Sequence, residues 1–398
     1  MTAWHEIRRL IHAGDADDLI DRLVTLSPAD RGFVAAELRG HLPVLRARAE
    51  AGRASLWDED GWEELSLEPW EQWAELTRLA GAGTLGTAAA VAAWVTRRDL
   101  LTEHRHLPAA GFGDPAPMVR LLGHRPAAWQ ADLAVRLAGR LRGPRDPGAP
   151  LALALLRHTA AAPPPHDPLV VAWVSGGAAA SSDPLMPALV PRLFEAEGVG
   201  RALRHERAAP PTGWLKLLGG LDREEILDGC VRRFLRGGTA QDLRFFARLH
   251  ELLAPTAAEV ERRRRDYVRL LPVAPGPVAD LALHHLRRLG GHDPAEVTEA
   301  LEGLLFRAET KLVRAGLTWF DETVRESPAL ADDLAPALAS AFGHESYPVQ
   351  GRAAQLALKH RRRFGAAGAE RIRAALNALP PALEARLVPA FAGVAPVG

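Results

Sequence analysis

The feature that most constrains this chain is a repeat of amphipathic helix pairs that recurs every 34 to 38 residues after Leu221. One pair cannot bury its apolar stripe alone, so repeats of this length stack and share a continuous core. The period therefore predicts an all-α fold, arranged as a right-handed α-solenoid of helix pairs. The first helices carry one aliphatic register, formed by Ile226, Val260, Val297, Leu334 and Ile372.

The same period appears twice more, in a leucine one turn further along the first helices and in a valine of the second helices. We expect six of these side chains to be nearly fully buried, namely Val297, Leu301, Leu334, Leu338, Ile372 and Leu376. The alternative is an irregular helical bundle whose spacings agree by chance. The residues concerned are Leu301, Leu338 and Leu376 in the first helices, and Val278, Val313 and Val349 in the second.

The N-terminal half is helical but less regular. Strand signals are nearly absent, because the chain has only two tyrosines and its β-branched residues rarely alternate with polar ones. We expect four parts: an N-terminal helical cap over 1–51, an acidic Trp-rich loop over 52–68, irregular helical repeats over 69–221 and regular repeats over 222–398.

Composition excludes several classes of protein. The 49 basic and 49 acidic residues cancel, which argues against a strongly basic nucleic-acid coat. The single cysteine, Cys230, excludes an intrachain disulfide framework and a multi-thiolate metal site. No apolar run approaches the roughly 20 residues that span a bilayer, and the N-terminus does not resemble a secretory signal. We therefore expect a cytoplasmic protein that does not enter a membrane.

Two motifs suggest ligand sites but have simpler explanations. The segment Gly81–Gly86 matches the GxGxxG pattern, yet it follows a predicted helix and not the strand that a dinucleotide site requires. We interpret it as a turn between helices. His284, His285 and His292 cluster on or near one helix, with His285 expected near the buried side, but no metal-binding spacing accompanies them. We expect no metal and no cofactor.

The basic runs Arg262–Arg265 and Arg361–Arg363 are the obvious candidates for phosphate contacts. Four consecutive arginines in a helix point around most of its circumference, so they do not form a one-sided stripe. Glu259, Glu261 and Asp266 bracket the first run at spacings that allow ion pairs. Solvated helix faces explain both runs, and a phosphate-binding groove is the alternative.

The most unusual stretch extends from Leu56 to Leu76 and contains four of the ten tryptophans and eight acidic residues, with no basic residue. Tryptophans ringed by carboxylates suit docking to a basic protein surface, because tryptophan is a frequent interface anchor. A loop folded back on its own helices is the alternative. The candidate partner-binding residues are Trp57, Asp58, Glu59, Asp60, Trp62, Glu63 and Glu64.

Residues 308–364 resemble a known family. The segments AETKLVRAGLTWF (308–320) and LAPALASAFGHESYPVQGRAAQLALKH (334–360) resemble HEAT-like repeats of an uncharacterised α-solenoid family of high-GC bacteria. Its members are encoded beside a MoxR-type AAA ATPase, a von Willebrand A protein and a SWIM zinc-finger protein. The resemblance is good over about the last third of the chain. It implies a non-catalytic scaffold in a multi-protein system, and it offers no catalytic residues.

A second resemblance gives a different function. HEAT-like DNA glycosylases that repair alkylated bases use a concave surface with tryptophan, arginine and an acidic residue. The nearest equivalents by residue type are Arg314, Trp319, Asp321 and Arg352. A stand-alone helical enzyme is a third class. A continuous positive groove would favour nucleic acid, whereas a mixed-charge groove would favour a protein partner, and we expect the latter, with only weak binding to nucleic acid.

Overall fold

The computed structural model describes residues 2–56, 69–97, 100, 114–176, 181–290 and 293–392. Within these ranges the chain is helical and contains no β-strand; an isolated bridge joins Ala208 to Pro211. The predicted all-α class is therefore confirmed. No helix in the described part of the chain is both long and apolar enough to cross a membrane. The chain divides into two compact units, Met1–Leu203 and Arg204–Gly398.

The first unit is built around α4, which packs against α1, α2, α3, α5 and α6. Side-chain caps at Asp15, Ser27 and Thr87 begin α2, α3 and α5, because each oxygen accepts a bond from an otherwise unpaired amide. Helix α3 continues to Leu56, five residues beyond the expected boundary at 51. The helices are α1 (Ala3–Ala13), α2 (Ala16–Val24), α3 (Pro28–Leu56), α4 (Pro69–Thr84), α5 (Ala88–Val95), α6 (Ala116–Leu122), α7 (Ala127–Ala138), α8 (Ala149–Thr159), α9 (Asp167–Ser175), α10 (Met186–Leu193) and α11 (Val199–Ala202).

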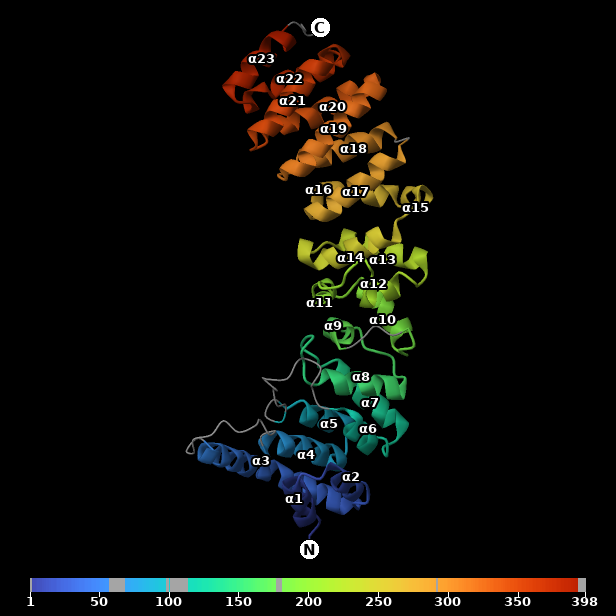
Figure 1. Cartoon of the computed structure of the whole chain (residues 1–398), viewed down its shortest axis with the longest axis vertical. Helices are drawn as coiled ribbons and strands as arrows, with labels where there is room; N and C mark the ends of the chain where they lie inside the picture. The colour runs from blue at the N-terminus through green and yellow to red at the C-terminus, as the bar shows by residue number, and fades with distance from the viewer. Residues whose placement is uncertain are drawn as a thin grey trace. The chain divides into compact units, whose positions relative to one another are not determined.

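The second unit contains the helix pairs, which follow one another from α13 to α23 in the yellow-to-red part of the chain (Figure 1). Helices α13, α16, α18, α20 and α22 form one layer, in which each packs against the next. Helices α14, α17, α19, α21 and α23 form the other layer in the same way. The bounds are α12 (Gly213–Leu218), α13 (Arg223–Arg236), α14 (Ala240–Leu253), α15 (Ala257–Arg262), α16 (Arg264–Val273), α17 (Gly276–Leu289), α18 (Pro294–Leu305), α19 (Thr310–Glu326), α20 (Ala331–Ser340), α21 (Tyr347–His360), α22 (Ala366–Ala374) and α23 (Pro381–Phe391).

The predicted registers lie in the core between these layers. The aliphatic residues of the first helices, from Ile226 to Leu376, are at most 5% exposed, and the three valines of the second helices are at most 1% exposed. The burial predicted for six of them, from Val297 to Leu376, is confirmed. One detail differs from the expectation. The first helix of the second pair is divided into α15 and α16 at Arg263.

Polar contacts also join successive pairs at the turns between first and second helices. Arg307, in the turn after α18, donates to the carbonyl oxygens of Leu271 and Ala274 at the end of α16, at 2.6 and 2.8 Å. His344 donates from Nε2 to the carbonyl oxygen of Ala308 in the preceding turn, at 3.2 Å, while its Nδ1 accepts from Ser346. The third and fourth helix pairs thus each supply a side-chain donor to backbone carbonyl groups of the preceding pair.

Replacing Leu338 by alanine tests the shared core. Leu338 is completely buried, so the free energy of unfolding is expected to fall by about 2–5 kcal/mol, as for other large-to-small core changes. Leu235→Ala removes the same atoms from a position that is 41% exposed, and a loss of about 1 kcal/mol or less is expected. Urea unfolding followed by circular dichroism measures both. Equal losses in the two variants would contradict the assigned core.

Candidate functional site

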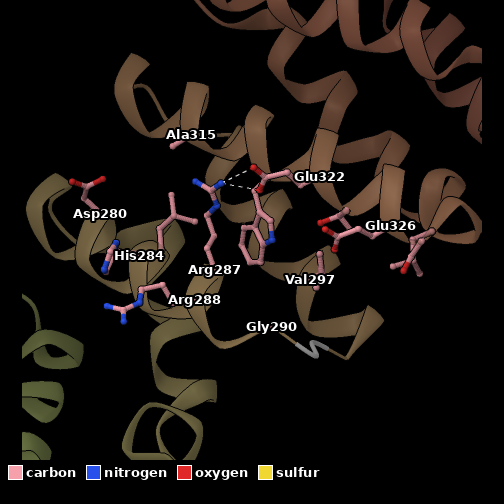
Figure 2. Close-up of a pocket in the computed structure, with 14 residues that line it drawn as sticks. Asp280, His284, Arg287, Arg288, Gly290, Val297, Ala315, Glu322 and Glu326 are labelled. Atoms are coloured by element: carbon pink, nitrogen blue, oxygen red, sulfur yellow. Dashed lines mark hydrogen bonds and ion pairs between the residues drawn. The ribbon is translucent and has the colours of Figure 1, made fainter. Parts of the chain in front are cut away.

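A cleft of about 590 Å³ in the second unit lies between α17 and α19. The start of α18 and the short 3₁₀ turn η1 (Pro328–Leu330) close one end. Figure 2 shows α17 and α19 contributing facing side chains. The lining residues that carry charge or can donate hydrogen bonds are Asp280, His284, Arg287, Arg288, Trp319, Glu322, Thr323, Glu326 and Ser327.

Helical spacing brings these side chains to the cleft. His284 and Arg287 are three residues apart on α17, and Trp319, Glu322 and Glu326 lie at i, i+3 and i+7 on α19, so each set shares one helix face. The guanidinium of Arg287 crosses between the helices and donates from Nη2 to both carboxylate oxygens of Glu322, at 2.8 and 2.7 Å. About a third of each side chain is exposed, so this pair fixes geometry more than it stabilises the fold.

Opposite charges line the two walls of the cleft. Arg287 and Arg288 project from α17, whereas Glu322 and Glu326 project from α19 (Figure 2). Asp280 adds a carboxylate at the α17 side, and it accepts a bond from Lys311 at 2.7 Å. Because negative groups interrupt the positive ones, the cleft does not form a continuous cationic surface. It can make polar contacts of both signs with another chain.

Trp319 lines this cleft but is only 6% exposed. Its indole therefore serves as a wall, and it presents little free surface on which a base could stack. Asp321, two residues further along α19, points about 200° away around the helix axis. The tryptophan and the acid proposed for a nucleic-acid groove therefore do not meet on one surface.

Asp321 belongs instead to a buried ion cluster between α19 and α21. Its carboxylate accepts bonds from Lys359 Nζ at 2.7 and 2.8 Å and from His360 Nε2 at 2.6 Å. Burial acts to raise the pKa of Asp321, but the bonds and charges of Lys359 and His360 outweigh it, so the pKa lies below its usual value. Arg314 and Arg352, the other two candidates for the groove, are exposed on α19 and α21.

The run Arg262–Arg265 joins neighbouring helix pairs. Every arginine of the run is in an ion pair with a carboxylate. The predicted local pairing is confirmed for Arg264, which contacts Glu261, but the sequence analysis missed the partners on adjacent pairs. These ion pairs reduce the charge that the run could offer to phosphates. The partners are Glu224 and Asp228 on α13, Glu261 on α15 and Glu299 on α18.

The glycines of Gly81–Gly86 serve helix packing. Residues 81–84 form the end of α4, and the connection to α5 is confined to residues 85–87, so the turn begins later than expected. A Cβ atom on Gly81 would lie 2.0 Å from Nε1 of Trp94, and one on Gly83 would lie 3.2 Å from Leu23. Close approach of α4 to its neighbours therefore explains both glycines without a nucleotide.

The acidic Trp-rich segment cannot be placed in the same way. Its candidate partner-binding residues, Trp57, Asp58, Glu59, Asp60, Trp62, Glu63 and Glu64, lie outside the described residues. Their docking to a basic partner stays a prediction. Within the described ranges, no three or more His, Cys, Asp or Glu side chains are grouped in a way that could hold a metal ion.

A buried polar cluster lies between α14, α16 and α17. His250 is completely buried, and its Nε2 lies 2.7 Å from the hydroxyl of Tyr267. The ring of His285 lies 5.0 Å from that of His250 and is partly buried, as its sequence position predicted. Burial, reinforced by nearby positive charge from His285 and Arg263, lowers the pKa of His250 to about 3. Cys230 is also buried, which raises the pKa of its thiol and argues against a reactive role.

No protein-family model matches the chain, and no curated protein or solved structure is similar to it at a significant level. Its function is therefore argued from its own residues.

The buried His250 predicts a specific dependence of stability on pH. An unfolded histidine takes up a proton below about pH 6.5, whereas folded His250 stays neutral down to about pH 3. Lowering the pH through this window therefore favours unfolding, by up to about 1.4 kcal/mol per pH unit. We expect His250→Phe to flatten the decline of unfolding free energy between pH 6.5 and 5 by about 1–2 kcal/mol. Urea unfolding at a series of pH values measures it, and an unchanged slope in the variant would refute the assignment.

Proposed function

We propose that this chain is a non-catalytic α-solenoid scaffold of HEAT-like helix pairs that binds a protein partner. The observation that carries the proposal is the mixed charge of the cleft between α17 and α19. Helix α17 contributes Arg287 and Arg288 to this cleft, and α19 contributes Glu322 and Glu326. A protein segment with side chains of both signs complements such walls, whereas a polyanion would meet repulsion from the α19 carboxylates.

The two-layer packing of α13 to α23 supports the solenoid part of the proposal. Each pair buries its aliphatic registers against its neighbours, as stacked repeats must. The resemblance of residues 308–364 to a HEAT-like family suggests the setting, a multi-protein system with an AAA ATPase and a von Willebrand A protein. In that setting the acidic segment around Trp57 and Trp62 would provide a further contact with a basic partner.

A DNA-binding or DNA-repair protein remains the second candidate, and the geometry favours it less. Exposed arginines do lie on successive second helices, at Arg288, Arg314 and Arg352. However, Asp321 is bonded to Lys359 and His360, and Trp319 faces a different cleft. The tryptophan and the acidic residue that a glycosylase would need on one surface therefore lie on two different surfaces.

Reversing the exposed charges of the cleft tests the proposed function. The immobilised chain is used to capture partners from its host, and the partner identified by mass spectrometry is then purified for titration. Arg288→Glu combined with Glu326→Arg is expected to weaken its binding at least ~10-fold. Each substituted side chain then has the same sign of charge as the partner group that it contacts, and the two repel each other. Arg386→Glu, an exposed charge reversal on α23, is the matched control and should bind normally. Unaltered binding by the cleft variant would exclude the cleft as the binding site.

A titration with duplex DNA distinguishes the protein-binding function from the DNA-binding one. We expect weak, non-specific binding that disappears between about 50 and 200 mM salt, because the net charge of the chain is zero and the arginines of the run Arg262–Arg265 are held in ion pairs. Fluorescence anisotropy with a labelled duplex, with and without an alkylated base, measures this. Tight binding at physiological salt would reverse the order of the two candidate functions.

A further inference from the structure

The cleft between α17 and α19 has a separate compartment at the end that α18 and η1 close. Figure 2 shows Glu326 and Val297 on one side of the Arg287–Glu322 ion pair and Arg288 on the other. That pair therefore separates the compartment from the more basic part of the cleft. We call the compartment the Glu326 pocket, and the residues that line it are Val297, Thr323, Glu326, Ser327 and Leu330.

The carboxylate of Glu326 is the one charged group of this pocket, and it is exposed. The basic side chains nearest to it along the chain or across the cleft have other partners. Arg325 donates from Nε to the backbone carbonyl oxygen of Asp321 at 3.2 Å and lies 3.7 Å from its carboxylate. Arg287 is bonded to Glu322. Within the described part of the chain, Glu326 therefore forms no ion pair.

The position of Glu326 on its helix also favours a bound cation. Glu326 is the last residue of α19, and the C-terminal end of a helix carries a partial negative charge. Basic side chains stabilise this end, whereas a carboxylate has the same sign of charge as the helix terminus. The stability of α19 therefore gives no reason for an acid at this position. A cation in the pocket would interact favourably with both the carboxylate and the helix end.

We propose that the Glu326 pocket holds a basic side chain of the partner segment that binds the cleft, and that arginine is the best fit. The carboxylate of Glu326 and the hydroxyl groups of Thr323 and Ser327 provide several acceptors. A guanidinium presents five donors in one plane and can bond to more than one acceptor at once. Val297 and Leu330 provide apolar surface for the methylene groups. This inference rests on the proposed function, because it names the group that the cleft recognises.

An arginine side chain can be tested at the pocket without the native partner. The probe is N-acetylarginine amide, whose one charge is the guanidinium, and the control is N-acetylcitrulline amide, which has the same shape and no charge. The full chain is labelled with 5-fluorotryptophan, and the ¹⁹F signal of Trp319, which lines the cleft, is assigned by its absence from Trp319→Phe. Titration should shift this signal with an affinity at least ~10-fold higher for the arginine probe, because charge-assisted hydrogen bonds are stronger than neutral ones.

Removing the charge of Glu326 completes the test. Glu326→Gln should lower the affinity for the arginine probe ~10-fold, to that of the citrulline control, and leave the thermal melt unchanged because the side chain is exposed. Glu251→Gln, at an exposed position on α14, is the matched control and should bind the probe normally. An unmoved Trp319 signal, equal affinity for both small molecules, or full affinity in Glu326→Gln would overturn the proposal.

The inference and the proposed function fail in different ways. Loss of partner binding by the charge-reversed cleft variant, without any response of Trp319 to the arginine probe, would refute the role of the Glu326 pocket alone. Normal partner binding by that variant, together with a response to the probe, would refute the proposed function of the cleft and leave the pocket as a site for a cation.

Discussion

The second unit depends on one constraint, which is that no helix pair can bury its own apolar stripe. Val297, Leu334 and Ile372 are at most 4% exposed, and the helices that carry them pack against helices of neighbouring pairs. This packing sets the distance between pairs, and that distance in turn fixes which polar groups meet.

Ion pairs in this unit repeat with the helix pairs. Arg223 bonds to Glu259, Arg263 to Asp228 and Arg287 to Glu322, and the partners are 35 or 36 residues apart in each case. These ion pairs join adjacent helix pairs, and they reduce the charge that the three arginines can offer to a ligand.

The sequence predicted the parts of this arrangement that depend on periodicity. The buried valines and leucines follow directly from spacing, and Gly81–Gly86 was interpreted as a turn and not a dinucleotide site because no strand precedes it. The partners of Arg263 and Asp321 were not predicted, because a carboxylate one repeat away gives no signal in a local window. For the same reason Trp319 and Asp321 seemed to form one site, although neighbouring positions on a helix point in different directions.

The contacts of Arg307 have a consequence for how the chain is made. Arg307 completes the end of α16, yet it lies 36 residues beyond Leu271, whose carbonyl it binds. A ribosome releases the chain from its N-terminus, so α16 emerges well before the side chain that finishes it. His344 has the same relation to Ala308. During synthesis, the carbonyl groups of Leu271 and Ala308 therefore emerge before the side chains that bond to them in the folded chain.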